Sequence, residues 1–290
     1  MKFSLIIGTL NRTEQLKICL KQIDKQIYRD FEVIIVDQSN DNLTYEMVNN
    51  IKVGYKIKYF KSEIRGLSRA RNIALRKADG KYFCLIDDDG YYFPDYLNIA
   101  NNILENSDGK RILSGYIWDT KKQKEFVKYP NKALKRISII KIMHICPSAA
   151  LIIPYAAWEE IGGFDENFGI GGKFSAGEET DFLLYAIKNN YYIYYIPEIK
   201  LEHPILLKKK EKIPLLEQDN YKRILYMKGT GALISKHLIY EKNYILILVF
   251  IEMILKLLIK FLLNNKKNDY SKKQLTEMIK GFMEYRKERK

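Results

Sequence analysis

The sequence predicts an α/β protein in which parallel strands are covered by helices, followed by a helical C-terminal region. Two observations lead to this prediction. Short β-rich runs alternate with helical patterns through the first ninety residues, and such alternation with short connections gives parallel strands with helices packed on the sheet. From residue 205 onward the sequence changes to long helical patterns. We therefore expect an α/β domain over residues 1–205 and a helical region over 206–290.

Four strand patterns separated by helical patterns make up the first half of the expected α/β domain. After the first strand, apolar residues recur at helical spacing as far as Ile27. Asp41 precedes a short helical pattern and Gly80 follows a longer one, in positions typical of helix caps. The expected strands cover residues 3–8, 31–37, 55–60 and 82–87, and the longer helix covers 66–80.

The second half of this domain has less regular patterns. Pro94 begins a helical pattern that ends at Glu105. A glycine-rich loop precedes another helix, which begins at about Gly177 and has an apolar face. The expected strands here cover residues 111–118, 144–153, 191–197 and 199–204.

Charge and cysteine content narrow the class of protein. The formal net charge is +14, but the lysines are spread over the whole chain, which is typical of a solvated surface rather than a nucleic-acid face. Cys19, Cys84 and Cys146 fall in apolar runs without metal-ligand spacing, and we expect reduced core residues, which suits the cytosol. The apolar run at the N-terminus is too short for a signal peptide.

Polar residues follow the expected strands, at the edge where such sheets bind ligands. Thr9, Asp37 and the run Asp87, Asp88 and Asp89 each lie at the end of a strand pattern. Adjacent carboxylates repel one another, and a hard cation such as Mg²⁺ or Mn²⁺ would neutralise them while sharing its ligand shell with phosphates. On spacing alone, a solvated acidic turn is the simpler explanation.

Four motifs in order, between residue 3 and about residue 204, resemble the family 2 glycosyltransferases of the GT-A fold. Each motif is weak by itself, but together they form a specific signal. They read "FSLIIGTLNR", "VIIVDQSNDN", "RGLSRARNIALRKADGKYFCLIDDD" and "GGFDENFG" with the following "GEETDFLLYAIKNNYYIYYIPEIKLEHP". The resemblance implies a mixed sheet flanked by helices and an enzyme that moves a sugar from a nucleotide-diphosphate sugar to an acceptor hydroxyl with inversion.

The resemblance also implies roles for individual residues. Asp87 and Asp89 match the outer positions of the family's Asp-x-Asp motif, which binds a divalent metal, Mn²⁺ or Mg²⁺. His203 falls where many members place a further metal ligand, and Asp37 where many members read the nucleotide base. A UDP- or TDP-sugar donor is favoured. The residues expected to bind the nucleotide-sugar are Thr9, Asn11, Arg12, Asp37, Ser39, Gly66, Arg71, Asp87 and Asp88.

The sequence departs from the family at "GEETD" (177–181). Members usually carry Glu-Asp here, and the second residue is the catalytic base, which this chain replaces by Glu179, a carboxylate one methylene longer. Glu178 and Asp181 stay as alternatives for the base. All three also lie at an expected helix start, where the helix dipole favours carboxylates without any catalytic role.

The tail contains an apolar stretch at 244–263 with a single polar stripe formed by Glu252, Lys256 and Lys260. Such a stripe is tolerated by a helix lying in a membrane interface, whereas a span needs about twenty apolar residues. We expect peripheral contact with the inner face of the cell membrane, which suits a polysaccharide or lipid-linked glycan acceptor. A core helix, a helix that pairs two subunits as a homo-oligomer, and a true membrane span are the alternatives. "KGTGALISKH" (228–237) fits a helix start or a lipid-phosphate contact.

A nucleotidyltransferase and a basic nucleic-acid-binding protein are the alternatives to a glycosyltransferase. A nucleotidyltransferase acting on sugar phosphates would carry a glycine-rich basic loop after the first strand, and "GTLNR" is a poor substitute. A non-catalytic basic protein that binds nucleic acid would carry a clustered basic face, and the scattered lysines argue against it.

Overall fold

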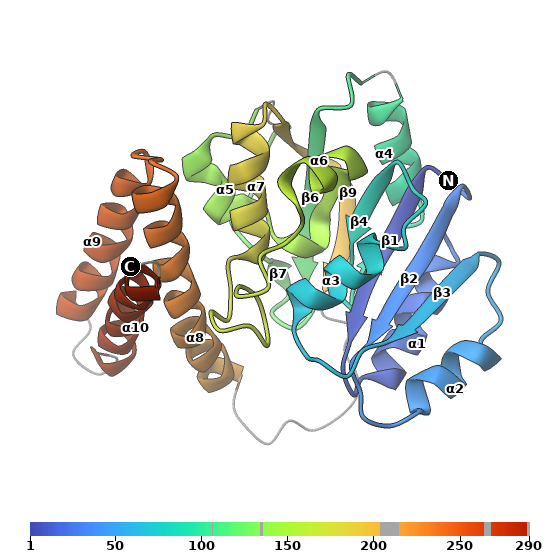
Figure 1. The fold of residues 1–290 in the computed structure, drawn as a ribbon, viewed down its shortest axis with the longest axis horizontal. Helices are drawn as coiled ribbons and strands as arrows, with labels where there is room; N and C mark the ends of the chain where they lie inside the picture. Colours follow the sequence, from blue (N-terminus) through green and yellow to red (C-terminus); the bar gives the residue numbers. More distant parts are fainter. Residues whose placement is uncertain (106, 134–135, 204–214, 264–267, 289–290) are drawn as a thin grey trace. The chain divides into compact units, whose positions relative to one another are not determined.

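The computed structural model describes residues 1–105, 107–133, 136–203, 215–263 and 268–288 (Figure 1). The chain forms two compact units. The first, called the sheet unit here, comprises Met1–Phe164 and the segment that begins at Phe182 and includes the last strand. The second, the helical unit, comprises Asp165–Asp181 and the C-terminal helices. The predicted domain boundary at 205/206 lies outside the described residues.

One mixed sheet forms the centre of the sheet unit, with strand order β3-β2-β1-β4-β8-β6-β9-β5, and β7 pairs with β6. Strands β1 to β4 run parallel, β8 is antiparallel to β4 and β6, and β9 is parallel to β6. The strands are β1 (Phe3–Thr9), β2 (Phe31–Asp37), β3 (Lys56–Lys61), β4 (Tyr82–Leu85), β5 (Tyr91–Tyr92), β6 (Arg111–Asp119), β7 (Lys124–Glu125), β8 (Leu151–Pro154) and β9 (Tyr192–His203).

Helices cover both faces of this sheet, and an apolar core lies under each set. Leu16 and Leu20 of α1 pack on one face with Leu97 of α4, whereas Ala70 of α3 and Leu183 of α7 pack on the other. The helices of the sheet unit are α1 (Thr13–Ile23), α2 (Leu43–Asn50), α3 (Leu67–Leu75), α4 (Tyr96–Leu104), α5 (Ile139–Ile145), α6 (Tyr155–Ile161) and most of α7 (Glu178–Lys188). The mixed sheet flanked by helices confirms the predicted fold class.

Two predicted helix ends differ from the structure. Ile27 lies beyond the end of α1 and is exposed. Helix α3 ends at Leu75, so Gly80 is not its cap. A Cβ atom at Gly80 would lie 2.6 Å from the backbone nitrogen of Ser4 in β1, so the glycine permits close approach of the chain to that strand.

Proline residues explain two further differences among the strands. The predicted strand 144–153 is reduced to β8, because Pro147 offers no N–H to a strand ladder and the residues before it form α5. The two predicted strands 191–197 and 199–204 are one strand, β9, whose pairing with β6 shifts register across Pro197. Residue 204 lies outside the described residues.

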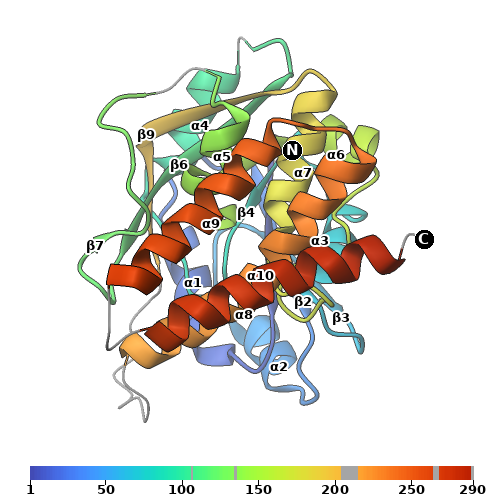
Figure 2. The same ribbon diagram turned by 90° about the vertical axis from the view of Figure 1, so that its left-hand side faces the viewer.

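The helical unit contains α8 (Leu215–Ser235), a π-helical turn (Lys236–Tyr240), α9 (Leu246–Leu263) and α10 (Asn268–Glu288). Helix α10 packs along α8 and α9 (Figure 2). The α8–α10 crossing is close because it is made by glycines: a Cβ atom at Gly231 would lie 1.8 Å from the carbonyl oxygen of Met278. The prediction that 228–237 begins a helix is wrong, because this segment forms the end of α8 and the start of the π-helical turn.

The state of the cysteines and the length of the apolar helices bear on two further predictions. Cys19, Cys84 and Cys146 are free and buried, as expected for reduced core residues. Among the described residues, no helix combines the length and apolarity that crossing a membrane would require.

Candidate active site

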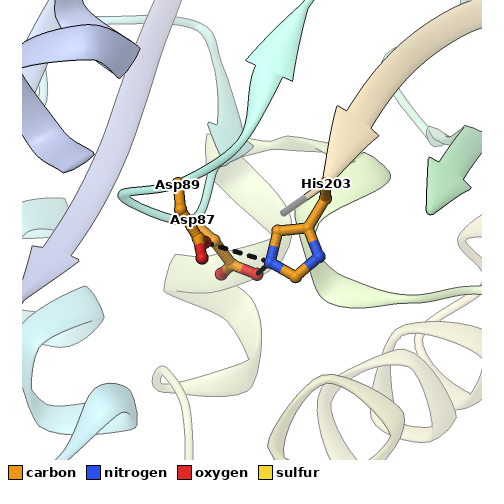
Figure 3. Close-up of side chains that lie close together, drawn as sticks. All are labelled: Asp87, Asp89 and His203. Atoms are coloured by element: carbon orange, nitrogen blue, oxygen red, sulfur yellow. Dashed lines mark ion pairs between the residues drawn. The ribbon is translucent and has the colours of Figure 1, made fainter. Parts of the chain in front are cut away.

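Side chains from two strand ends of the sheet unit converge on one acidic cluster. Asp87 and Asp89 follow β4, His203 ends β9, and their side chains point toward one another (Figure 3). His203 Nε2 lies 3.3 Å from Asp87 Oδ2 and 3.1 Å from Asp89 Oδ1. One ligand atom from each residue lies within 4.8 Å of the other two. The three residues predicted to share a metal are therefore close enough to do so.

Protein cations balance the three adjacent carboxylates. The Arg12 guanidinium lies 2.8 Å from Asp88 Oδ1 and pairs with Asp89 through its other terminal nitrogen. Thr9 Oγ1 donates a hydrogen bond of 2.8 Å to Asp88 Oδ2. Arg71, whose side chain is buried, lies 3.9 Å from Asp87. The aspartate run is therefore built into the strand end and is not a solvated turn.

Burial and neighbouring charges separate the proton affinities of this cluster. Burial raises the pKa of Asp88 to about 7, although Arg12 and Thr9 oppose the shift. Burial also disfavours the charged form of Asp89, but His203 and Arg12 outweigh it and lower the pKa of Asp89 to about 2. Burial acts against the imidazolium of His203, but Asp89 and Asp87 raise its pKa above the usual value. Asp89 is thus the firmly ionised carboxylate, and Asp88 is easier to protonate than Asp89.

The donor set of the cluster fits a divalent cation. Asp89 Oδ1 is buried and makes no hydrogen bond of ordinary geometry with the described residues, and the His203 imidazole lies 3.1 Å from it. A buried carboxylate oxygen is costly unless a cation satisfies it, and here either the protonated His203 ring or a metal ion could do so. Carboxylate oxygens suit Mg²⁺ and Mn²⁺, and a neutral imidazole nitrogen is a common metal ligand.

The Asp37 carboxylate is fully buried at the end of β2 and is engaged by its own neighbours. Oδ1 accepts hydrogen bonds from the backbone nitrogen and the hydroxyl of Ser39, at 2.9 and 2.5 Å. Oδ2 accepts from the Tyr59 hydroxyl at 2.7 Å and from Lys61 at 3.2 Å. Burial opposes ionisation, but these donors together lower the pKa of Asp37. In this structure Asp37 orders the loop after β2, and its predicted contact with a nucleotide base stays a prediction.

Three other residues predicted to bind the nucleotide-sugar shape the loops around this edge. Asn11 has a left-handed backbone (φ 55°), and its N–H donates to the Ser39 hydroxyl at 2.8 Å. Gly66, at the start of α3, has φ 138°, which only glycine adopts easily. Both its backbone polar groups bond the side-chain amide of Gln38. Sequence reasoning did not single out Gln38, whose only signal is its place directly after Asp37.

The carboxylates predicted to contain the base lie in the first turn of α7 and belong to the helical unit. Glu178 is buried and Glu179 is partly exposed. Asp181 is buried and accepts hydrogen bonds at 2.8 Å from Lys236 and 2.7 Å from His237. Sequence reasoning interpreted "KGTGALISKH", which ends in Lys236 and His237, as a helix start or a lipid-phosphate contact and assigned it no partner in the protein.

A family model described as Glycosyl transferase family 2 matches residues 4–160, more than half of the chain. The chain therefore belongs to this family. A similar curated protein is an uncharacterised glycosyltransferase of Rickettsia prowazekii (strain Madrid E), 24% identical over 215 residues, or 71% of this chain. Another is the poly(ribitol-phosphate) beta-N-acetylglucosaminyltransferase TarS of Staphylococcus aureus (strain Mu50 / ATCC 700699), 30% identical over 104 residues, or 34% of this chain and 18% of TarS. The chain spans 63% of the length of the Rickettsia relative.

Solved structures share the fold. S. aureus TarS 1–349 superposes with a TM-score of 0.61 at 17% identity, covering 99% of this chain and 92% of that one. TarS 1–349 in complex with UDP-GlcNAc gives a TM-score of 0.59 at 20% identity, covering 81% and 66%. The mannosyltransferase PcManGT from Pyrobaculum calidifontis, in complex with GDP-Man and Mn²⁺, gives 0.60 at 20% identity, covering 82% and 64%. The GT-A fold implied by the sequence motifs is confirmed.

Proposed function

We propose that this protein transfers a sugar from a nucleotide-diphosphate sugar to an acceptor hydroxyl, with inversion at the anomeric carbon. The observation that carries the proposal is the Asp87, Asp89 and His203 cluster at the strand ends of a family 2 chain. Strand ends of this kind are where open α/β sheets bind their ligands.

On the donor side, a nucleoside diphosphate leaves readily only when its developing negative charge is stabilised. A divalent cation held by Asp87, Asp89 and His203 supplies this Lewis-acid stabilisation when bound. Arg12 is 40% exposed and lies against the cluster, so its guanidinium is available to a phosphate oxygen. Thr9 holds Asp88 through its hydroxyl, and this bond keeps Asp88 turned toward the first strand.

On the acceptor side, a hydroxyl becomes an effective nucleophile when a positioned carboxylate removes its proton. We assign this role to Glu179, because it is the more exposed glutamate of the first turn of α7, and Asp181 is bonded to Lys236 and His237. The acceptor oxygen bonds to the anomeric carbon as the bond to the diphosphate oxygen breaks, and the proton passes to Glu179. A single displacement of this kind inverts the anomeric carbon.

The donor and acceptor classes are inferred from the sequence and from the neighbours' ligands. The TarS and PcManGT structures hold UDP-GlcNAc and GDP-Man with Mn²⁺ respectively. We favour a UDP-sugar, with a TDP-sugar as the alternative, Mn²⁺ or Mg²⁺ as the metal, and a polysaccharide or lipid-linked glycan as the acceptor.

We also propose that α9 binds the inner face of the cell membrane peripherally. The helix exposes aliphatic side chains at a spacing of three and four residues, which places them on one face. Lys256 and Lys260 are exposed on the same helix and suit anionic lipid headgroups. The exposed aliphatic residues on this face are Leu248, Ile251, Leu255, Ile259 and Leu262. A second copy of the chain is the alternative occupant of this face.

Thermal stability in the presence of nucleotides tests the donor site. UDP, TDP, GDP and CMP are each added with and without Mn²⁺ to the wild type, to Asp89→Ala and to a control, Asp30→Ala, which removes an exposed carboxylate outside the cluster. A ligand at a hundred times its dissociation constant adds about 2.7 kcal/mol to the free energy of unfolding. We expect metal-dependent stabilisation by one nucleotide that only Asp89→Ala abolishes. No stabilisation by any nucleotide would overturn the proposed function.

Substitution of the carboxylates on α7 tests the acceptor side. Glu179→Gln should lower the rate of transfer by about 10² to 10⁴, the range that positioned proton transfer supplies, while nucleotide affinity is unchanged. Glu178→Gln is the matched control in the same turn. Equal turnover of Glu179→Gln and wild type would move the base to another carboxylate.

A further inference from the structure

Within the helical unit, a buried charged cluster joins the first turn of α7 to the π-helical turn that follows α8. The Lys236 ammonium lies 2.8 Å from both Asp165 Oδ2 and Asp181 Oδ2, and His237 Nε2 lies 2.7 Å from Asp181 Oδ1. The side chains of Asp181, Lys236 and His237 are only 4%, 7% and 3% exposed. Both carboxylate oxygens of Asp181 are thus bonded by consecutive residues, Lys236 and His237, which lie more than fifty residues further along the chain.

The charges in this cluster depend on one another. Burial opposes the charged form of Lys236, but Asp181 and Asp165 outweigh it and raise the pKa of the ammonium. Burial likewise acts against ionised Asp165, but Lys236 and the amide of Asn167 lower the pKa of its carboxyl. Removing the ammonium would leave the buried carboxylate of Asp181 and the partly buried carboxylate of Asp165 near each other without a shared cation, which is unfavourable.

The backbone of the preceding loop is held by the same stretch of α8. A Cβ atom at Gly229 would lie 2.5 Å from the carbonyl oxygen of Ala176, so the helix lies directly against the loop there. Gly177, with φ 100°, faces Leu233. Lys236 also stands 5.2 Å above the ring of Phe168. The contacts therefore span the loop from Phe168 to the first turn of α7.

The two basic residues that bond Asp181 belong to a π-helical turn. Consecutive residues of an α-helix point about 100° apart, yet Lys236 and His237 each bond a different oxygen of Asp181. Both belong to the single π-helical turn that follows α8. Such turns are rare and are frequent at functional sites.

We infer that Lys236 and His237 are positioning residues for the acceptor-activating carboxylate, acting through Asp181; this inference rests on the proposed function. Asp181 and Glu179 share the first turn of α7, so fixing the Asp181 carboxylate fixes the backbone that carries Glu179. The C-terminal helices are therefore part of the transfer machinery as well as a surface for lipid.

Hydrogen exchange tests the positioning without any substrate. The amides of residues 174–184 are followed in the full-length wild type, in Lys236→Met and in His237→Phe, which keeps an aromatic ring but offers no hydrogen bond. Glu284→Gln is the control. It removes a 2.8 Å ion pair between α10 and Lys228 of α8 and leaves the contacts of Asp181 unchanged. We expect faster exchange in the first two variants only. Exchange equal to that of wild type in the folded variants would overturn the inference.

Kinetics then test the consequence for transfer. In Lys236→Met and His237→Phe, kcat should fall by about 10²-fold, the cost of a misplacement of about 1 Å, while the affinity for nucleotide with Mn²⁺ stays within twofold. Lys236→Arg, which keeps the charge, should restore most of kcat. If Lys236→Met does not fold, His237→Phe decides, because it leaves the Lys236 ion pairs intact. Equal losses of kcat and nucleotide affinity would overturn the inference, whereas an inactive wild type with loop exchange as expected would count against the proposed function alone.

Discussion

His203 is the residue at which protons and the proposed metal ion would compete. Burial opposes the imidazolium of His203, but Asp89 and Asp87 outweigh it and raise the pKa of the ring, so the metal-free cluster favours the imidazolium more than an isolated histidine would. A metal ligand must be neutral imidazole. If His203 is a metal ligand, proton release should therefore accompany metal binding.

The affinity for Mn²⁺ should accordingly increase with pH. Below the raised pKa of His203, one proton is released for each ion bound, so the affinity should rise up to about tenfold per pH unit. Isothermal titration of the wild type with Mn²⁺ between pH 6 and 8 measures this slope. His203→Asn should bind more weakly and show a flatter slope in this range, and an equal slope in both proteins would contradict the assignment of His203 as a ligand.

Asp88 gives a separate pH dependence in the metal-free protein. Burial raises the folded-state pKa of Asp88 to about 7, above the ordinary value of 3.8. Between these values the folded protein holds a proton that the unfolded chain releases, so the free energy of unfolding should fall as the pH rises from about 5 to 7. The slope reaches up to about 1.4 kcal/mol per pH unit. Urea unfolding between about pH 5 and 7 should show this decrease in the free energy of unfolding for the wild type. In Asp88→Asn, the part of the decrease that Asp88 causes should be absent.

At the level of helices, the crossing of α8 and α10 depends on two glycines. A Cβ atom at Gly281 would lie 1.9 Å from the carbonyl oxygen of Lys228, which mirrors the contact of Gly231 with Met278. Lys228 is also paired with Glu284 across the crossing at 2.8 Å. The backbones can approach only because both positions lack a side chain.

Gly231→Ala should therefore destabilise the protein. In an exposed helix interior the same change stabilises by about 1 kcal/mol, but here overpacking should cost about 1–3 kcal/mol or more. Urea unfolding followed by circular dichroism measures the difference. Lys222→Ala, at an exposed position of α8, should change stability by less than about 0.5 kcal/mol. A stabilised Gly231→Ala would show that the helices separate easily at this point.

The sequence predicted those elements whose pattern is local. Strands such as β2 are buried along their whole length, so a continuous apolar run located them, and polar strand ends located Asp87 and Asp89. His203 was found through the family motif alone. Gly231 opposite Met278 and Lys236 with Asp181 were not predicted, because their partners lie far along the chain, 55 residues in the second case, and no local period marks such pairs.

The whole chain carries a net charge of +14, and α9 adds an exposed aliphatic face. The positive charge attracts anionic surfaces at long range. The aliphatic face of α9 provides the apolar area that a membrane interface can bury. Deleting residues 240–290 would also remove α10, against which α8 packs. Substitutions on the surface of α9 are therefore the sharper test of membrane binding.

Replacing Leu248, Leu255 and Leu262 with Gln should release the protein from vesicles containing anionic lipid. These residues are 61%, 52% and 73% exposed, so the change removes apolar surface without opening the core. The control replaces three exposed aliphatic residues of the sheet unit, Ile27, Leu43 and Ile64, with Gln. Co-sedimentation is measured, with light scattering alongside. Unchanged sedimentation, or conversion of a dimer into a monomer without an effect on lipid binding, would assign the α9 face to something other than lipid.

The grouping of Asp165–Asp181 with the C-terminal helices has a consequence for recombination between related enzymes. A crossover placed between the last strand and α8 would inherit Asp181 from one parent and Lys236 with His237 from the other. Such chimaeras would keep the fold of each part, but Asp181 and the two basic residues would no longer come from the same parent. The exchangeable module is discontinuous, and a donor of new C-terminal helices must also supply its own loop from 165 to 181.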